Sequence, residues 1–581
     1  MKFLRNLLAS ILGFFIATFL IFLFFIAIAS VIGSEEEVTV KPNSVLELDL
    51  TTTVKDYAPK DDNPILEALE LTDEKLALNK IINAIENAKN DANIKGISIK
   101  TTAVNAGVSQ TQAIRNKIKN FKESGKFVYA YNDVYSQKNY YLSSVADSVF
   151  LNPVGAIDFK GLSTEILYYK DFEDKYGVKM EVIRHGKYKS AVEPYLANKM
   201  SEANREQTTS FLKSIWSEIT TEISDSRNIT TQQLNLIADN ANGRNATIAK
   251  ENKLIDAIIY EDEYKEKLAL HTDKKVNTIS LQDYIKSGKG HISSTAKNKI
   301  AVIYAQGEIM YAEGNENIIG QGIINKALRK ARKDKNVKAI VLRVNSPGGS
   351  ALASELIWRE LELTKKVKPL VVSMGDVAAS GGYYIACNAD KIIAEPTTIT
   401  GSIGVFGAIP NFNELAGKIG INAEQVATNN SPNYSVFEPM DKRFYEVTKE
   451  GVEQTYTTFV NRVAAGRNMT FEQVNDVAQG RVWSGKEAIK KGLVDKLGNL
   501  NDAIVIAAEL AKVDTYKVRN YPNYNTELKD SFNLSPFAKV SKEDILKEAL
   551  GDENYQLYNN INQMKKLKGI QARMPFLLQI K

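Results

Sequence analysis

An internal repeat is the feature of this sequence that most restricts its fold. Residues 91–97 (DANIKGI) return as residues 334–340 (DKNVKAI), 243 positions later. The same spacing relates further identical pairs: Asp133 and Asp376, Tyr140 and Tyr383, Pro153 and Pro396, Gly161 and Gly404. Because a register held over so many positions is a signature of duplication, we interpret the body of the chain as two copies of one structural unit.

Each copy alternates short apolar runs with amphipathic stretches, which predicts an α/β fold. A chain of 581 residues also exceeds what one ordinary core accommodates. We therefore predict a first repeat over residues 35–290 and a second over residues 297–525, with a polar linker between them. Residues 526–581 form a mixed-charge, helix-like tail without a motif.

The first 34 residues have the pattern of a membrane anchor. A nearly unbroken apolar run extends from Leu7 to Gly33, which is long enough to cross a bilayer as a helix. Lys2 and Arg5 precede the run, and this charge predicts a cytoplasmic N-terminus with the bulk of the chain outside. A cleaved signal peptide is the alternative, since residues 27–29 (AIA) resemble a cleavage site, but the run is longer than a usual signal core.

Composition excludes several classes of function. The net charge of +5 is small for this length, and the chain has neither zinc-finger spacing nor a long basic arm, so we expect no nucleic-acid partner. The single cysteine, Cys387, leaves no thiol cluster for a metal. The nucleotide-binding pattern GxxxxGK[ST] is also absent. We predict no metal and no cofactor.

Ser380 lies at a predicted corner between a strand and a helix. The apolar run Pro369–Met374 indicates the strand, a turn is expected at Gly375, and the helix is expected to begin near Gly381. Unpaired N–H groups of a first helical turn favour negative charge on a nearby oxygen, which suits a nucleophile. The alternative is a simple N-cap. The first repeat has Gln137 at the corresponding position.

Lys189 is present in the first repeat and absent from the second, which is the reverse of Ser380. It lies in residues 188–194 (YKSAVEP), and the matching segment of the second repeat has Tyr434 in its place. A lysine serves as a general base if burial lowers its pKa. A solvent-exposed charge is the alternative role for Lys189, and His185 is the rival base among the three histidines. One duplicated site that now takes one group from each repeat explains both losses.

A glycine-rich turn supplies a candidate oxyanion site. Residues 346–350 (SPGGS) precede a predicted helix, whereas the first repeat has AVNAG at residues 103–107. The backbone N–H of Gly348 or Gly349, together with that of Gly381, is suited to hold a tetrahedral oxyanion. An ordinary turn before a helix is the alternative.

Three segments together resemble the signal peptide peptidase A family in its long, two-repeat form: residues 375–384 (GDVAASGGYY), 188–194 (YKSAVEP) and 480–485 (GRVWSG). The resemblance implies that Ser380 is the nucleophile, that Lys189 is the general base and that Ser402 orients the lysine. The first repeat has Phe159 where the second has Ser402. The implied fold is two tandem β-β-α superhelical domains similar to Clp protease and crotonase, behind a transmembrane helix.

The resemblance further implies a serine endopeptidase that degrades signal-peptide remnants and other hydrophobic or unfolded peptides. It implies a homotetramer in a bacterial inner membrane, with a single span and the bulk of the chain on the periplasmic side. Two alternatives come from other classes: a crotonase-type acyl-CoA enzyme and a non-catalytic membrane scaffold. Whether Ser380 and Lys189 meet within one chain or across two chains stays open at this point.

Overall fold

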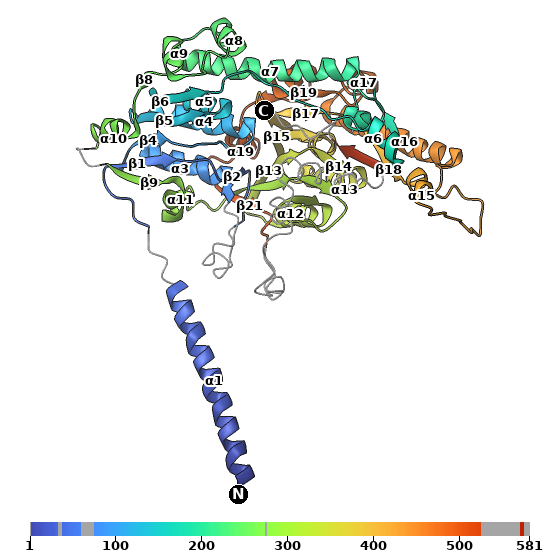
Figure 1. The fold of residues 1–581 in the computed structure, drawn as a ribbon, viewed down its shortest axis with the longest axis horizontal. Coiled ribbons are helices and arrows are strands. Elements are labelled where there is room, and N and C mark those ends of the chain that lie inside the picture. The colour runs from blue at the N-terminus through green and yellow to red at the C-terminus, as the bar shows by residue number, and fades with distance from the viewer. Residues whose placement is uncertain (1, 33–37, 60–74, 273–275, 525–569, 574–581) are drawn as a thin grey trace.

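The computed structural model describes residues 2–32, 38–59, 75–272, 276–524 and 570–573 (Figure 1). Helix α1 (Lys2–Ile32) projects away from an elongated α/β body. Within it, residues Arg5–Phe24 are apolar and long enough to cross a membrane, with a mean hydropathy of 2.7. The helix is consistent with the predicted anchor.

The first repeat is built on a parallel six-stranded sheet with the order β8-β6-β5-β4-β1-β9. Its strands, which include the short pair β2 and β3 and the separate strand β7, are β1 Ser44–Leu48, β2 Thr53–Lys55, β3 Lys75–Ala77, β4 Ile94–Ile99, β5 Phe127–Tyr135, β6 Ser148–Ile157, β7 Lys179–His185, β8 Ala257–Ile258 and β9 Asn277–Ser280. Its helices are α3 Leu78–Asn90, α4 Val108–Lys122, α5 Gln137–Ser143, α6 Lys170–Tyr176, α7 Glu202–Arg227, α8 Thr231–Asp239, α9 Ala246–Glu251, α10 Glu261–Ala269 and α11 Leu281–Tyr284.

The second repeat has the same plan in an eight-stranded sheet, β19-β17-β15-β13-β10-β21, with β16 and β20 extending from β15. The strands of this repeat are β10 Lys299–Gln306, β11 Glu308–Met310, β12 Ile318–Gly320, β13 Val337–Ser346, β14 Gly348–Ser350, β15 Leu370–Ala379, β16 Lys391–Ala394, β17 Ile399–Gly401, β18 Val405–Asn411, β19 Val482–Ser484, β20 Lys496–Leu497 and β21 Lys517–Tyr521. Its helices are α12 Gln321–Lys333, α13 Ala351–Lys365, α14 Gly381–Ala386, α15 Asn413–Lys418, α16 Lys442–Arg467, α17 Phe471–Val477, α18 Gly485–Ala488 and α19 Leu500–Leu510.

Matching elements keep the spacing seen in the sequence. Helices α3 and α12 begin and end 243 residues apart, and so do helices α4 and α13. Helix α3 buries Leu78, Ile81 and Ile85 on one face, the spacing of an amphipathic helix against a sheet. The structure thus contains the duplicated α/β unit that the sequence predicts.

One prediction about strand β15 was wrong. The chain does not turn at Gly375 but stays extended to Ala379, because residues Val377–Ala379 pair with β17 after a register shift beside Ser346. The strand therefore runs directly up to Ser380.

A third sheet joins the repeats, with the order β12-β11-β14-β22-β18-β7. Strand β7 of the first repeat pairs antiparallel with β18 of the second, from Lys179↔Asn411 to His185↔Val405. Strand β22 (Ile570–Arg573) lies between β14 and β18. The predicted helical tail lies outside the described residues except for β22, which is a strand.

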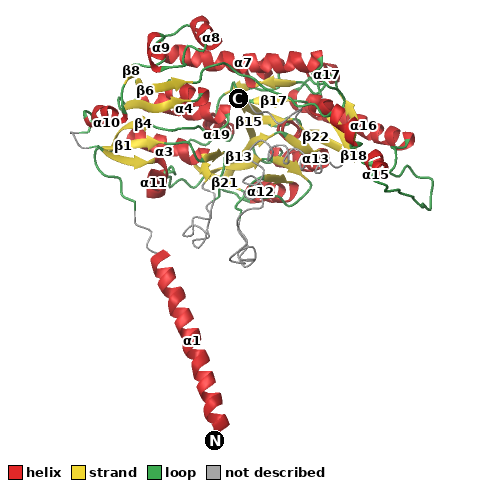
Figure 2. Cartoon of the chain, viewed as in Figure 1, coloured by secondary structure: helices red, strands yellow, loops and turns green. Residues whose placement is uncertain are grey.

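The two repeats also share a core. Helix α7 of the first repeat lies along both halves of the body and packs against β19 of the second (Figure 2). Ala379, Ile399 and Val482 from the second repeat are buried in the hydrophobic core of the first. This shared core fixes the position of one repeat relative to the other, and the candidate site lies between them.

Candidate active site

Ser380 occupies the corner between β15 and α14 in a strained conformation. Its φ of 55° and ψ of −116° are rarely adopted by residues other than glycine, and its N–H donates to the carbonyl of Gly401 at 2.8 Å. The side chain is fully buried and makes no capping hydrogen bond to helix α14. The N-cap alternative therefore does not describe this serine.

Lys189 reaches Ser380 from the other repeat, within the same chain. It follows strand β7 and directly precedes the 3₁₀ helix Ser190–Tyr195. Its Nζ lies 2.9 Å from Ser380 Oγ, 3.1 Å from Ser402 Oγ and 3.2 Å from the Ser402 carbonyl oxygen. The structure thus brings together the three side chains that the sequence singled out.

The surroundings of Lys189 disfavour a positive charge. The residue has no exposed surface, and burial lowers its pKa well below the ordinary value of 10.5. Among the described residues, no carboxylate forms an ion pair with this amine. The polar partners of its Nζ are serine oxygens, which a neutral amine satisfies as well as an ammonium. Lys189 is therefore not the exposed surface charge that was the alternative.

Two glycines make room for the lysine side chain. A Cβ on Gly480 would lie 2.7 Å from the backbone N, Cα and Cβ of Lys189, and a Cβ on Gly404 would lie 3.2 Å from its Cδ. Gly480 also has a φ of +80°. Both glycines belong to segments that the sequence analysis quoted, but their role depends on packing between repeats, which no local pattern reveals.

Ser402 is held by the loop that contains Arg481. It is fully buried, has a φ of 51°, and its N–H donates to the Arg481 carbonyl at 2.6 Å. Arg481 directly follows Gly480, so one loop fixes Ser402 and also leaves space for Lys189. Since both oxygens of Ser402 contact the amine, the arrangement limits the directions in which the amine points.

The three predicted oxyanion glycines lie close together. Gly381 is the first residue of α14, and a Cβ on Gly348 would lie 2.8 Å from its nitrogen. The N–H of Gly348 donates to Ser346 Oγ at 3.1 Å, so this donor already has a partner within the loop. Gly348 and Gly349 have φ values of +100° and +151°, which explains glycine at both positions.

His185, the rival base, and Gln137, the counterpart of Ser380 in the first repeat, both have other contacts. The ring of His185 stacks on Tyr456 with centroids 3.9 Å apart, and burial lowers its pKa. In the first repeat, Gln137 takes the position of Ser380, and its Oε1 accepts from the N–H groups of Lys160 at 2.9 Å and Gly161 at 2.8 Å. The Gln137 amide therefore has a structural role at the corresponding strand-to-helix corner of the first repeat.

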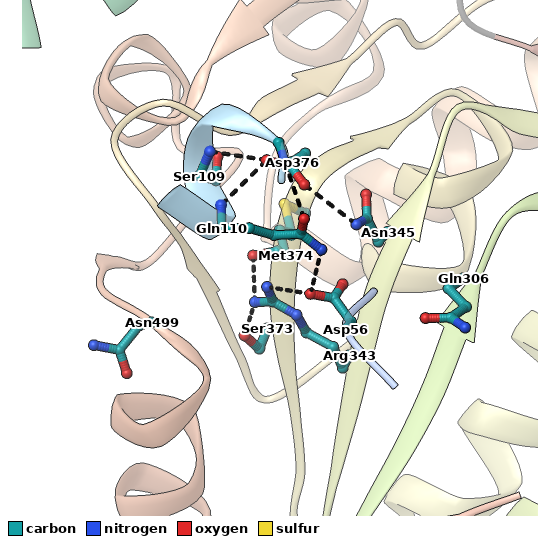
Figure 3. Close-up of polar contacts among 12 residues, drawn as sticks. Asp56, Ser109, Gln110, Gln306, Arg343, Asn345, Ser373, Met374, Asp376 and Asn499 are labelled. Atoms are coloured by element: carbon teal, nitrogen blue, oxygen red, sulfur yellow. Dashed lines mark hydrogen bonds and ion pairs between the residues drawn. The ribbon is translucent and has the colours of Figure 1, made fainter. Parts of the chain in front are cut away.

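A buried polar network fastens the strand that ends at Ser380 to the first repeat (Figure 3). The carboxylate of Asp376, on β15, accepts from the N–H groups of Ser109 at 2.8 Å and Gln110 at 3.2 Å, at the start of α4. Arg343, on β13, forms a fully buried ion pair with Asp56 at 3.1 Å. The repeat that supplies Lys189 therefore also holds the strand that carries Ser380.

Comparison with known proteins identifies the family. Peptidase family S49 matches residues 120–277 and again residues 362–514. "Protease 4" of Haemophilus influenzae is 37% identical over 496 residues, which cover 81% of this chain and 80% of that protein. "Serine protease SPPA, chloroplastic" of Arabidopsis thaliana is 35% identical over 454 residues, which cover 76% and 67% of the two chains. The class defined by the fold and the matches is a peptidase with a duplicated α/β unit. The chain belongs to peptidase family S49, in its long two-repeat form.

Two solved structures resemble parts of the chain. A ClpP1 mutant from Listeria monocytogenes has a TM-score of 0.24 and 17% identity, covering 35% of this chain and 94% of its own. A mutant of the 1510-N membrane-bound stomatin-specific protease has a TM-score of 0.27 and 17% identity, covering 39% and 99%.

Proposed function

We propose that this protein is a membrane-anchored serine endopeptidase that cuts cleaved signal peptides and other hydrophobic or unfolded segments. The contact between Lys189 Nζ and Ser380 Oγ at 2.9 Å carries the proposal, and no carboxylate in the described part of the chain forms an ion pair with this lysine. Relatives named "Protease 4" and "Serine protease SPPA, chloroplastic" support the serine peptidase class.

The proposed chemistry follows from the donors and acceptors around Lys189. As a neutral amine it has two N–H groups and one lone pair. The two N–H groups suit the oxygens of Ser402, and the lone pair then faces the Ser380 hydroxyl. Ser380 Oγ attacks a peptide carbonyl while Lys189 takes its proton, and the N–H groups of Gly349 and Gly381 stabilise the oxyanion. Lys189 then protonates the leaving amine, and water hydrolyses the acyl-enzyme.

The proposed location is a bacterial inner membrane, with one span and the body on the periplasmic side. The span Arg5–Phe24 supports the membrane, and Lys2 and Arg5 at its start support a cytoplasmic N-terminus. An anchor of this kind keeps the site near peptides that are left in the bilayer. Protease accessibility of the body in spheroplasts, but not in intact cells, tests this orientation.

The proposed assembly is a homotetramer. Within one chain β7 pairs with β18, but residues 162–168 and 422–428, which correspond to these strands at the 243-residue spacing, form no strand. Pairing of these two segments between neighbouring copies would repeat the internal contact and close a ring. Native mass spectrometry tests this assembly. We expect the mass of four copies for the wild-type protein and the loss of that species in the variant Ile166→Pro, because proline removes a backbone N–H that strand pairing needs.

The function is tested with a fluorogenic leucine-containing peptide. We expect Ser380→Ala and Lys189→Ala each to abolish its hydrolysis, and a serine-reactive phosphonate to label the wild-type protein but not Ser380→Ala. Full activity in either variant refutes the proposed pair. Binding of coenzyme A by the wild-type protein would favour the acyl-CoA enzyme instead.

A further inference from the structure

Gln207, on helix α7, contacts the residues on both sides of Lys189. Its Nε2 donates to the carbonyl oxygen of Tyr188 at 3.0 Å and to Ser190 Oγ at 3.0 Å. A third contact of Nε2, to Asn204 Oδ1 at 3.2 Å, stays within the helix. The side chain of Gln207 is fully buried. The residues before and after the lysine are therefore tied to one buried amide.

The same amide also contacts the second repeat. Gln207 Oε1 accepts from the N–H of Val482, on β19, at 3.3 Å. Val482 directly follows Arg481, whose carbonyl accepts from the N–H of Ser402. One side chain of the first repeat therefore links the segment that carries Lys189 to the loop that holds Ser402.

The chemistry of these contacts calls for a neutral amide. The Tyr188 carbonyl can only accept a hydrogen bond and the Val482 N–H can only donate one, so the side chain between them needs both a donor and an acceptor. An ionised glutamate only accepts and a lysine only donates, so either would satisfy one side alone. Glutamine satisfies both sides, and it places no charge beside the buried amine of Lys189.

The second repeat lacks this amide, as it lacks the lysine. Helices α7 and α16 are both 26 residues long and begin 240 positions apart, so Gln207 corresponds to Val447. Val447 is 52% exposed and therefore cannot act as a buried link. Tyr434 takes the position of the lysine in the same repeat. The amide is thus present only in the copy that has Lys189, which favours a role at the site over a role in the fold that both copies share.

The charged groups around the Lys189 segment have partners away from its amine. Arg184 donates to the Lys189 carbonyl oxygen at 3.3 Å. The carboxylate of Glu193 accepts from a backbone N–H at the start of α7 at 2.9 Å, and Arg481 pairs with Glu206 at 2.8 Å. Of the charged side chains that the structure describes, none pairs with Lys189 Nζ. Burial therefore governs the charge of this amine, and burial depends on how the segment is held.

We infer that Gln207 is a positioning residue, whose amide fixes the Lys189 segment against the second repeat so that the amine faces Ser380 Oγ in a site shielded from water. The inference deepens the proposed function and rests on it, since it assumes that Lys189 is the base of a serine peptidase. The contacts of Gln207 are to the neighbours of the lysine, so it acts on the geometry of the base and not on the reacting atoms.

Hydrolysis of the fluorogenic peptide by Gln207→Met, measured over a range of pH, tests the inference. Methionine has a similar volume but lacks the amide donor and acceptor. We expect kcat to fall by about tenfold or more with KM within about threefold, because a displaced base affects the chemical step rather than binding. The midpoint of the kcat/KM profile should rise by at least about 0.5 pH unit, since water that reaches the amine raises its pKa toward the ordinary value.

Gln112→Met is the matched control. Gln112 is equally buried and also joins the repeats, because it donates to Glu222 Oε1 at 2.8 Å and accepts from Thr397 Oγ1 at 2.8 Å. Its partners lie outside residues 188–190. The variant should lower the urea midpoint of unfolding, as Gln207→Met does, but leave the pH midpoint of kcat/KM at the wild-type value.

Ser190→Ala removes one of the two contacts that Gln207 makes beside the lysine and keeps the other. It should raise the pH midpoint of kcat/KM by a smaller amount, and it decides the question if Gln207→Met does not fold. If the wild type hydrolyses the peptide but neither variant moves the midpoint, or Gln112→Met moves it equally, the inference is wrong and the proposed function stands. A wild-type protein that does not hydrolyse the peptide would refute the proposed function itself.

Discussion

Lys189 Nζ and Ser380 Oγ lie 2.9 Å apart, although the two residues belong to different copies of a duplicated unit. Each copy has lost the group that the other retains: Gln137 replaces the serine, and Tyr434 replaces the lysine. The site therefore depends on the packing of one repeat against the other. Substitutions that disturb this contact should impair activity even when each repeat keeps its own fold.

The variant Lys189→Met separates activity from stability. Methionine has a similar length but no amine, so the proposed base is lost and kcat should fall by about 10²-fold or more. Burial of the amine costs free energy, and an apolar replacement of a buried polar group of similar volume is often stabilising. We therefore expect the free energy of unfolding to rise by about 1 kcal/mol or more. Peptide kinetics and urea denaturation measure the two effects.

Lys187→Met is the matched control, because Lys187 is exposed two residues before Lys189. It should keep its activity and change the free energy of unfolding by no more than about 0.5 kcal/mol. A Lys189→Met protein with wild-type kcat would contradict the proposed role of the amine.

The pH dependence of both activity and stability should report the lowered pKa of Lys189. The proposed base works when neutral, so kcat/KM should rise with pH and level off well below 10.5. Between the lowered folded pKa and 10.5 the unfolded chain binds one more proton than the folded chain, so this residue makes stability rise with pH. The difference in the free energy of unfolding between Lys189→Met and the wild type should therefore decrease from neutral pH toward pH 10.5. A pH profile of kcat/KM with its midpoint near pH 10.5 would contradict a lowered pKa for Lys189.

Gly480→Ala and Gly420→Ala form a pair that differs only in what the new methyl group meets. Both glycines have a φ of +80°, so each substitution should cost about 1 kcal/mol of backbone strain. The methyl group on residue 480 would press on the backbone of Lys189 at 2.7 Å, whereas residue 420 has nothing within 4 Å. A displaced catalytic group costs up to about 10²-fold in rate, so kcat should fall in Gly480→Ala alone. Equal kcat values in the two variants would show that Gly480 does not position the lysine.

Much of this architecture could be predicted from the sequence because duplication leaves a fixed register. The spacing of 243 residues aligns α3 with α12, and the strand-to-helix corner at Ser380 follows from local patterns. Comparison of the two copies also singled out Lys189. These features are local or repeated, and both kinds of signal survive in a single sequence.

The parts that escaped prediction depend on contacts between distant segments. Strand β22 has only four residues, and its place between β14 and β18 is set by two strands that precede it by more than 150 residues. The role of Gly480 appears only when Lys189 packs against it. Asp56 and Arg343 are 287 residues apart, and neither lies in a motif.

The buried pair of Asp56 and Arg343 yields the last prediction, through a double-mutant cycle (Figure 3). Removal of one partner leaves an unpaired buried charge, so Asp56→Leu and Arg343→Met should each cost about 3–5 kcal/mol. The double variant should recover much of this lost free energy of unfolding, because neither partner then leaves an unpaired buried charge. Arg343 also donates to Ser373 Oγ and to the Met374 carbonyl of β15, so its loss should lower kcat as well.

The exposed pair of Glu261 and Lys265, 3.0 Å apart, provides the matched control for this cycle. Solvent screens such a pair, so its removal should cost less than about 1 kcal/mol and leave kcat unchanged. Urea denaturation and peptide hydrolysis measure all variants. Costs near 1 kcal/mol for Asp56→Leu or Arg343→Met, with unchanged kcat, would show that this buried pair does not hold the repeats in register. The distance between Lys189 and Ser380 would then depend on the sheet and the shared core alone.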